Sequence, residues 1–205
     1  MSVKVKICGI TNLADALGAV EARADLLGFI FCATSPRHLT VAAAAEIAGQ
    51  LPAHIVKVGV FVNAPDELVV EAISACGLNM LQFHGEEKPE DCTKFGVMSI
   101  KAFRVRDAQS LEALLDYSTD AWLLDTFAER QAGGTGRTFD WELAVKAQRF
   151  GKPIFLAGGL DPANVIEAVR RVRPFAVDVS SGVESSPGKK DPAKVNTFIR
   201  SAKRA

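Results

Sequence analysis

Short apolar runs alternate with longer helix-like segments from one end of the chain to the other. The strand-like apolar runs cover residues 3–9, 26–31, 57–62, 80–84, 98–103, 121–126, 153–158 and 176–181. The helical patterns between and after them cover residues 12–23, 40–50, 65–76, 89–95, 108–116, 140–150, 162–172 and 192–203. Strands that alternate with helices favour a parallel sheet with the helices packed against it.

The number of these units predicts a closed barrel. Eight strand–helix units share 205 residues, and a (β/α)8 barrel has about 250 residues and at least roughly 200. The main alternative is a doubly wound open sheet, which needs a glycine-rich phosphate loop after its first strand. Here Cys8-Gly9-Ile10-Thr11 fills that place and no GxGxxG motif follows. We therefore expect one α/β domain over residues 1–205, a (β/α)8 TIM barrel of eight parallel strands with outer helices.

Composition and charge exclude several classes of protein. The 24 basic residues balance the 24 acidic ones, so no long-range field would draw the chain to nucleic acid or to anionic lipid. No apolar stretch is long enough to span a bilayer, and no signal-peptide pattern is present. The four cysteines have neither zinc-site nor disulfide spacing. We expect a cytoplasmic protein without nucleic-acid or membrane partners, acting as a monomer.

The strand faces indicate where polar chemistry gathers. In the first strand, Val5 and Ile7 share one face, whereas Lys6 and Cys8 share the other. Gln82 and His84 in the fourth strand, and Asp178 and Ser180 in the eighth, likewise lie opposite apolar neighbours. The apolar faces suit packing against helices, so the polar faces are expected to point into the barrel.

Two residues at strand ends are candidates for acid and base catalysis, because the active site of such barrels lies at the carboxyl ends of the strands. Cys8 ends the first strand, and its thiolate is a capable base whose pKa the nearby Lys6 ammonium would lower. Asp125 ends the sixth strand, and a partly desolvated carboxyl can act as a general acid. The alternatives are a small buried core residue for Cys8 and a loop cap for Asp125.

Two neighbouring strand ends are candidates for a phosphate site. Gly158 and Gly159 end the seventh strand, and Ser180, Ser181 and Gly182 end the eighth. Glycines let backbone N–H groups approach an anion, and barrel phosphate sites often use these two loops. Tight turns would explain either group alone, but both together favour phosphate.

Three further side chains are weaker candidates. Arg37, in the stiff Ser35-Pro36-Arg37 loop, suits a carboxylate, although a lone loop arginine is often merely solvated. His84 could titrate near neutrality or contact substrate, or be a satisfied structural histidine. Lys101 invites a Schiff-base aldolase hypothesis, which no neighbouring residue strengthens.

The segment after the sixth strand, residues 126–139, is long for so compact a chain. It contains Gly133-Gly134-Thr135-Gly136. Long loops are often lids with glycine hinges, and a plain connector is the alternative.

Seven motifs occur in an order that resembles a known enzyme family. They are Lys6-Ile7-Cys8-Gly9-Ile10-Thr11, Ser35-Pro36-Arg37, Gln82-Phe83-His84-Gly85, Leu124-Asp125, Gly133-Gly134-Thr135-Gly136 with Phe139-Asp140-Trp141, Leu156-Ala157-Gly158-Gly159-Leu160, and Asp178-Val179-Ser180-Ser181-Gly182-Val183-Glu184. Together they resemble the phosphoribosylanthranilate isomerases of tryptophan biosynthesis over nearly the whole chain.

The resemblance implies an Amadori rearrangement of a small phosphorylated substrate, with no cofactor and no metal. It makes Asp125 the general acid, Cys8 the general base and Arg37 the partner of the anthranilate carboxylate. It assigns the phosphate to Gly158, Gly159, Ser180, Ser181 and Gly182. We also expect His84 and Asp178 among the substrate-binding residues.

One hypothesis concerns the residues beneath the site. The first and last strands become neighbours when the barrel closes, so Lys6 and Asp178 are expected to form an ion pair. That pair would position Lys6 to stabilise the Cys8 thiolate while limiting the field of the ammonium.

Three other functions remain as alternatives. A sister barrel isomerase of the histidine pathway would be expected to carry an acidic residue in place of Cys8. An indole-glycerol-phosphate synthase would be expected to use lysines as acid and anchor. A catalytically inactive phosphosugar-binding module would need neither Cys8 nor Asp125.

Overall fold

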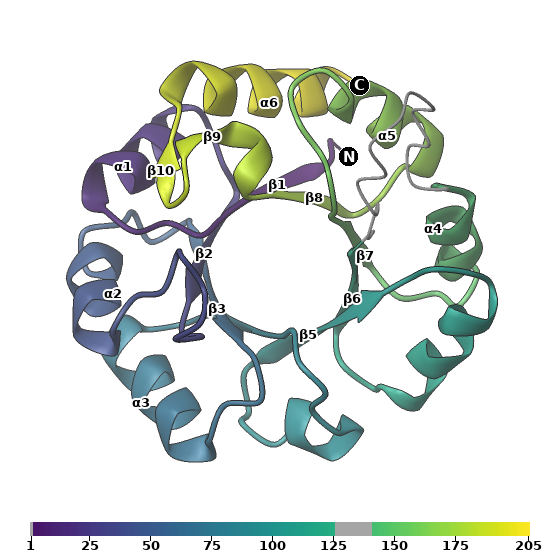
Figure 1. Cartoon of the computed structure of the whole chain (residues 1–205), viewed down its shortest axis with the longest axis horizontal. Coiled ribbons are helices and arrows are strands. Elements are labelled where there is room, and N and C mark those ends of the chain that lie inside the picture. Colours follow the sequence, from purple (N-terminus) through teal and green to yellow (C-terminus); the bar gives the residue numbers. More distant parts are fainter. Residues whose placement is uncertain (1, 126–140) are drawn as a thin grey trace.

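The computed structural model describes residues 2–125 and 141–205. Its eight main strands run parallel and close in sequence order into a barrel, with β8 paired to β1 (Figure 1). The strands are β1 (Lys4–Cys8), β2 (Leu26–Ile30), β3 (Val56–Phe61), β4 (Met80–Phe83), β5 (Met98–Arg104), β6 (Ala121–Asp125), β7 (Ile154–Leu156) and β8 (Ala176–Val179). The predicted (β/α)8 barrel is confirmed.

Helices surround the barrel on all sides (Figure 1). The α-helices are α1 (Leu13–Glu21), α2 (Val41–Ala48), α3 (Asp66–Cys76), α4 (Trp141–Gln148), α5 (Val165–Val172) and α6 (Pro192–Arg204). The expectation of helices over 89–95 and 108–116 needs correction, because 3₁₀ helices η1 (Pro89–Cys92) and η2 (Gln109–Asp116) occupy those connections. A 3₁₀ helix rises about 2.0 Å per residue against about 1.5 Å for an α-helix, so few residues cover the distance back to the next strand.

Capping residues decide where the helices begin. The Asp191 carboxylate accepts from the backbone N–H groups of Ala193 and Lys194, so α6 begins at Pro192 as the sequence predicts. The expected start of α5 at residue 162 is three residues too early. The Asp161 carboxylate accepts from the backbone N–H of Asn164, forming a separate turn ahead of Val165.

The core has two layers. The outer layer, between strands and helices, includes Val5 and Ile7 of β1. The inner layer fills the barrel with apolar side chains from the inward strand faces, among them Leu26, Val58, Met80, Ile100, Leu123 and Phe155. Lys6, Gln82 and Asp178 are buried in the same interior and are joined to one another by polar contacts. The predicted inward direction of the polar faces is therefore confirmed for these three residues.

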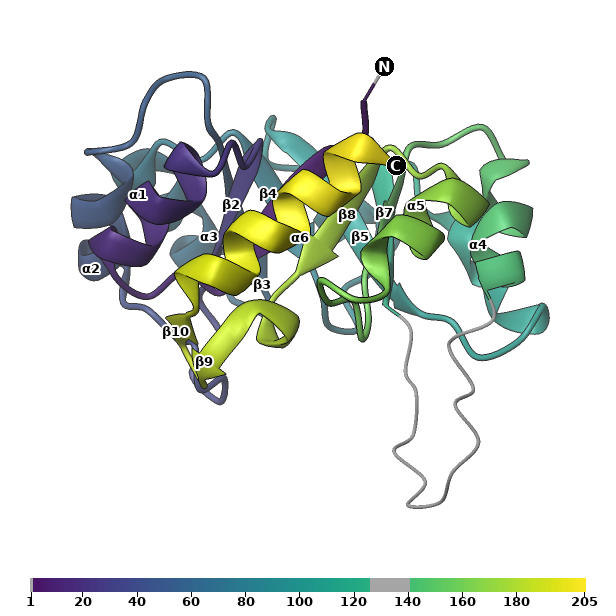
Figure 2. The same cartoon turned by 90° about the horizontal axis from the view of Figure 1, so that it is seen from above.

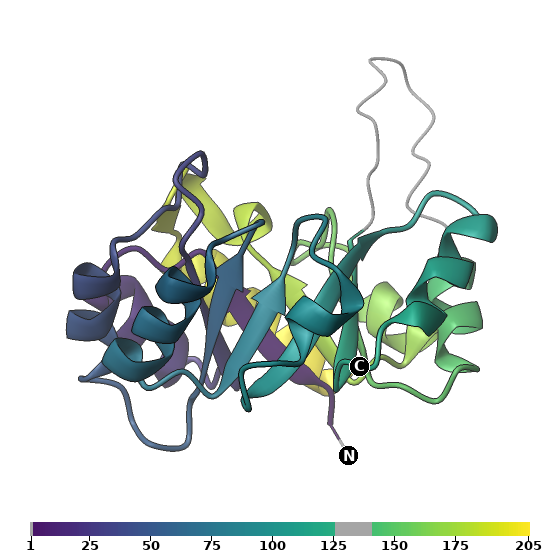
Figure 3. The same ribbon diagram turned by 90° about the horizontal axis from the view of Figure 1, so that it is seen from below.

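A short hairpin that the sequence patterns did not predict follows β8. The 3₁₀ turn η3 (Ser181–Val183) leads into β9 (Glu184–Ser186), which pairs antiparallel with β10 (Lys189–Lys190). The hairpin lies at the end of the barrel opposite the N-terminus, where the strands end (Figures 2 and 3). Over the described residues, no helix combines the length and apolarity needed to cross a membrane.

Candidate active site

Cys8 is the last residue of β1 and is 6% exposed. Space for its thiol depends on Gly28 of the neighbouring strand β2. A Cβ at Gly28 would lie 2.8 Å from Cys8 Sγ and 3.2 Å from Lys6 Cε. Gly28 therefore makes room for both side chains. A single glycine inside an apolar strand gave no sign of this role in the sequence.

Burial dominates the titration of the Cys8 thiol. Burial raises the pKa of Cys8 above its ordinary value, and the Lys6 and Lys190 ammonium groups oppose the rise without cancelling it. The expectation that Lys6 lowers the pKa of this thiol is correct for the direction of the pair interaction. It is wrong for the net result, because the loss of water around the thiolate outweighs the attraction.

The hypothesised ion pair beneath the site is present. Lys6 and Asp178 face each other in the β1–β8 register, and Lys6 Nζ lies 3.1 Å from Asp178 Oδ1. Although burial lowers the pKa of Lys6, its interactions with the Asp178 carboxylate and with Cys8 bring it above its ordinary value. Lys6 is therefore a buried ammonium. Asp178 is engaged with Lys6, and its expected contact with substrate stays a prediction.

A chain of polar contacts links Lys6 to Asp125 across the barrel. Lys6 Nζ donates to Gln82 Oε1 at 2.7 Å. Gln82 Nε2 lies 2.9 Å from His84 Nδ1, and His84 Nε2 lies 3.3 Å from Asp125 Oδ2. Asp125 is the last residue of β6. The structure thus joins the predicted acid to the residue that adjoins the predicted base.

Arg37 is not a solvated loop residue, because Glu184 of the hairpin holds it. Arg37 Nε donates to Glu184 Oε1 at 2.8 Å and Arg37 Nη2 donates to Oε2 at 2.7 Å. This side-on pair leaves the Nη1 end of the guanidinium for another anion. Gly9, at φ 73°, permits the approach, since a Cβ there would lie 2.5 Å from Arg37 Cδ.

Lys190 ties the same hairpin to the end of β1. Its buried ammonium donates to Glu184 Oε1 at 2.9 Å, to Cys8 O at 2.6 Å and to Ser180 O at 3.2 Å. Burial raises the pKa of Glu184, but the hydrogen bonds from Arg37 and Lys190 bring it below its ordinary value, so Glu184 is a carboxylate. Sequence patterns did not identify Glu184 and Lys190 as functional residues. Glu184 ends the Asp178–Glu184 motif, and Lys190 lies six residues further along the chain.

The two loops of the predicted phosphate site lie in contact. Gly158 and Gly159 have φ values of 85° and 63°, which favour glycine. A Cβ at Gly182 would lie 2.0 Å from Leu160 O, so only glycine lets the β8 loop pack on the β7 loop. Within residues 2–125 and 141–205, the buried Ser180 hydroxyl has no hydrogen-bond partner, and such groups normally have one. This arrangement is suited to an anion.

Lys101 has a structural role that accounts for its burial. Its ammonium donates to Glu87 Oε2 at 2.7 Å and to Gly85 O at 2.6 Å. Glu87 also accepts from the backbone N–H of Gly85 at 2.9 Å. The pair therefore fixes the turn that follows His84, and the Schiff-base hypothesis gains no support.

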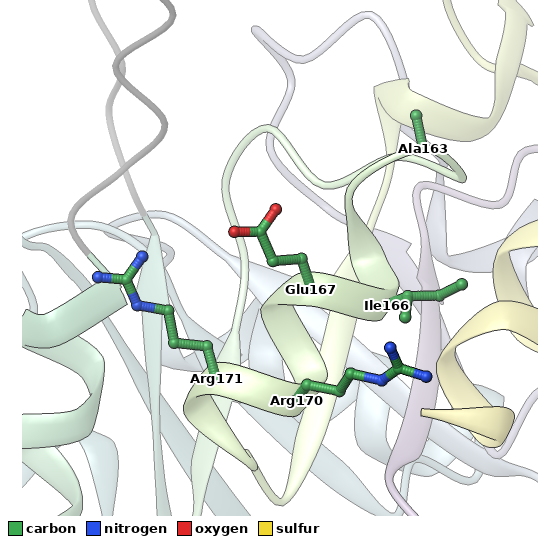
Figure 4. Close-up of a pocket in the computed structure, with 5 residues that line it drawn as sticks. All are labelled: Ala163, Ile166, Glu167, Arg170 and Arg171. Carbon is green, nitrogen blue, oxygen red and sulfur yellow. The ribbon is translucent and has the colours of Figure 1, made fainter.

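A shallow hollow elsewhere belongs to the outer helical layer. It is lined by Ala163, Ile166, Glu167, Arg170 and Arg171, on α5 and the turn before it (Figure 4). Arg171 pairs with Glu142 of α4 at 2.9 Å, and both side chains are about half exposed. Arg170 and Arg171 are exposed, and the hollow contains none of the predicted site residues.

Two remaining expectations concern a lid and a metal ion. The predicted lid over 126–139, with Gly133-Gly134-Thr135-Gly136, lies outside the described residues. In the part of the chain that the structure describes, no group of three or more histidine, cysteine, aspartate or glutamate side chains is placed to hold a metal ion.

Comparisons with known proteins show similarity to one family over nearly the whole chain. The family model of N-(5'phosphoribosyl)anthranilate (PRA) isomerase matches residues 5–201. The N-(5'-phosphoribosyl)anthranilate isomerase of Geobacter sulfurreducens is 54% identical over 201 residues, covering 98% of each chain. That of Citrifermentans bemidjiense is 55% identical over 201 residues, 98% of this chain and 97% of the relative.

Solved structures of the same family are similar to this fold over nearly the whole chain. The phosphoribosyl anthranilate isomerase of Thermotoga maritima has a TM-score of 0.92 and 45% identity, covering 99% of this chain and 100% of that one. A phosphoribosyl anthranilate isomerase in complex with reduced 1-(o-carboxyphenylamino)-1-deoxyribulose 5-phosphate has a TM-score of 0.90 and 43% identity, with the same coverage. Barrel, strand-end residues and whole-length similarity lead to one conclusion: the chain belongs to the phosphoribosylanthranilate isomerase family.

Proposed function

We propose that this enzyme converts N-(5-phosphoribosyl)anthranilate into 1-(2-carboxyphenylamino)-1-deoxyribulose 5-phosphate in tryptophan biosynthesis. The observation that carries the proposal is the pair of Cys8 and Asp125, which end strands β1 and β6 on different sides of one barrel mouth. A substrate between them has a base on one side and an acid on the other. The related enzyme in complex with a reduced phosphorylated product supports the substrate class.

Asp125 performs the first step as general acid. Its carboxyl group gives a proton to the furanose ring oxygen while the bond from that oxygen to C1 breaks. The lone pair of the anthranilate nitrogen forms the C=N bond of the protonated Schiff base. A positioned acid of this kind typically contributes about 10²–10⁴-fold in rate.

Cys8 performs the second step as general base. Its thiolate removes the proton from C2, the C–H electrons form the C1=C2 bond, and the C=N electrons return to nitrogen. The resulting enolamine gains a proton at C1 and loses one from the C2 hydroxyl, which gives the ketone. These steps move protons and rearrange bonds within one molecule, so acid and base side chains supply the chemistry.

Arg37 and the two glycine-containing loops hold the ends of the substrate in this proposal. The Nη1 end of Arg37, left over by Glu184, pairs with the anthranilate carboxylate. The phosphate lies against Gly158, Gly159 and the Ser180–Gly182 turn, where the Ser180 hydroxyl gains the partner it lacks among the described residues. His84 and Asp178 complete the predicted set.

We further propose a cytoplasmic monomer. A closed barrel has no unpaired sheet edge that calls for another chain. The enzyme of Thermotoga maritima is dimeric, so sedimentation velocity is the measurement that separates the two states.

The first experiment follows the loss of substrate fluorescence with wild type, Cys8→Ser and Asp125→Asn. We expect fast turnover by the wild type and a fall of about 10²–10⁴-fold in kcat for each variant, with binding of a reduced product analogue retained. Cys76→Ser, at a buried cysteine of an outer helix, and Asp116→Asn, at an exposed aspartate, are the matched controls. A wild type that turns over only the histidine-pathway aminoaldose would refute the assignment.

A further inference from the structure

Two hydrogen-bonding side chains, Gln82 and His84, connect the fixed charge of Lys6 to the proposed acid. Lys6 on β1, Gln82 on β4 and His84 directly after β4 follow one another across the barrel and end at Asp125 Oδ2. Lys6 is fully buried and Gln82 is 1% exposed. Water therefore does not compete for the Lys6–Gln82 contact, and each link constrains the next.

The direction of every link follows from the first donor. An ammonium has only N–H donors, so the Gln82 amide must turn its oxygen toward Lys6 Nζ. A flipped amide would place NH₂ against NH₃⁺. The Gln82 NH₂ group then faces His84 Nδ1 and donates to it at 2.9 Å. His84 Nδ1 must accept, so the ring proton resides on Nε2 and is donated to Asp125 Oδ2.

The buried ion pair keeps the direction fixed. Lys6 cannot easily lose its proton, because Asp178 Oδ1 lies 3.1 Å from its Nζ and the pKa of Lys6 is held above its ordinary value. The donor at the start of the chain is therefore permanent. Asp178, on the last strand, acts on the acid site through three intervening side chains.

The tautomer of His84 decides which oxygen of Asp125 carries the acidic proton. With Nε2–H donating to Oδ2, that oxygen is an acceptor, and the carboxyl proton resides on Oδ1. After proton transfer the same N–H stabilises the carboxylate. The opposite tautomer would present a lone pair to Asp125 and draw the acidic proton to Oδ2, away from the substrate.

We propose that Gln82 is a positioning residue that transmits the polarity of Lys6 to His84, holding the imidazole as its Nε2–H tautomer so that Asp125 donates from Oδ1. The role of Asp125 as donor rests on the proposed function, whereas the tautomer of His84 does not. Gln82 itself touches no reacting atom in this scheme.

The test measures the tautomer directly. The chain has three histidines, so nitrogen-15 resonances of the histidine side chains are assigned to His84 by comparison with His84→Asn. In the wild type we expect an unprotonated Nδ1 and a protonated Nε2. In Gln82→Glu both carboxylate oxygens accept, so Nδ1 gains a proton. In Lys6→Met the amide is free to flip, so the two tautomers mix.

Kinetics supply the second readout. In Gln82→Glu we expect kcat to fall about tenfold or more while KM changes little, because the lost interaction acts on the acid rather than on substrate binding. Gln50→Glu, at an exposed glutamine two residues after the end of α2, is the matched control and should behave as the wild type.

Each outcome bears on a separate claim. A wild-type His84 protonated at Nδ1, or a Gln82→Glu variant with unchanged ring nitrogens, overturns the proposal. If Gln82→Glu does not fold, mixed tautomers in Lys6→Met support the proposal and a single unchanged tautomer there overturns it. An Nε2–H tautomer in a protein without isomerase turnover supports the relay and overturns the proposed function.

Discussion

One carboxylate, Glu184, decides how Arg37 can meet a substrate. It occupies Nε and Nη2 of the guanidinium at 2.8 and 2.7 Å and at the same time neutralises the buried Lys190. A loop arginine without such a partner would lose considerable side-chain entropy on binding a ligand. Glu184 removes most of that cost in advance, because the guanidinium is already held in place.

Glu184→Gln is expected to raise KM more than it lowers kcat. An amide in the same position presents one oxygen and one NH₂ group, so one of the two Arg37 N–H groups loses its acceptor and Lys190 loses its carboxylate. Hydrogen bonds to charged groups contribute about 1.5–3 kcal/mol, so KM should rise about ten- to hundredfold. Steady-state kinetics measure the effect. Glu86→Gln, at an exposed glutamate, is the control, and an unchanged KM in Glu184→Gln would remove the role given to this pair.

At the scale of elements, the β7 and β8 loops must touch before a phosphate can bridge them. Gly182, in η3, packs directly on Leu160 O after β7. The contact brings the Ser180–Gly182 turn beside the Gly158–Gly159 turn. Neither loop has this arrangement on its own, so the proposed phosphate site is a property of two neighbouring strand–loop units.

Gly182→Ala is expected to separate these loops. The added methyl group would lie 2.0 Å from a backbone oxygen, so η3 must shift. Overpacking of this kind costs about 1–3 kcal/mol of the free energy of unfolding, and affinity for the phosphorylated substrate should fall with it. Chemical denaturation and KM report the two effects.

Gly18→Ala is the matched control for that substitution. Gly18 lies in α1, and a Cβ there would meet no atom within 4 Å. Alanine should stabilise that helix by roughly 0.5–1 kcal/mol. Equal stability and equal KM in Gly182→Ala and Gly18→Ala would contradict the contact.

At the scale of the whole molecule, closure of the barrel creates the environment of the base. The β1–β8 pairing sets Asp178 beside Lys6, and β2 seals the other side of Cys8 with Gly28. The same closure buries the thiol and raises its pKa. The two lysines near it limit that rise, so burial and charge act in opposite directions on one group.

The thiolate fraction of Cys8 is therefore expected to increase from neutral into alkaline solution. The thiolate is the proposed base, and the raised pKa moves its formation, measured as thiolate absorbance in the wild type minus that of Cys8→Ser, to higher pH. Lys6→Met removes a cation that lowers the pKa of Cys8. The thiolate should therefore form at a higher pH in this variant than in the wild type. One pKa unit changes the thiolate fraction about tenfold, so activity at neutral pH should fall by about that factor or more.

Lys4→Met, at an exposed lysine of the same strand, is the control for the pH profile. Formation of the Cys8 thiolate at the same pH in Lys6→Met and in the wild type would show that Lys6 has no effect on the thiol. Stability changes in the opposite direction. The unfolded chain releases the Cys8 proton first, so the free energy of unfolding falls as pH rises from the unfolded to the folded pKa.

Periodicity determined the architecture in advance of any structure. Eight apolar runs separated by helical segments have few ways to bury their surfaces other than a closed parallel barrel, and all eight runs form strands. The Asp191-Pro192 start of α6 also followed from local chemistry. The 3₁₀ helices at Pro89 and Gln109 did not, because helical periodicity in a short connection does not distinguish an α-helix from a tighter one.

Side-chain alternation likewise placed Lys6 opposite Asp178 and turned Gln82 inward, since both follow from a period of two and from the adjacency of the first and last strands. Partners from distant elements needed the tertiary structure. Glu184 meets Arg37 only because an unpredicted hairpin returns over the barrel. The raised pKa of Cys8 depends on how much water the closed barrel excludes. Local sequence fixes which atoms a residue offers, whereas the packed fold decides which atoms they meet and how much solvent remains between them.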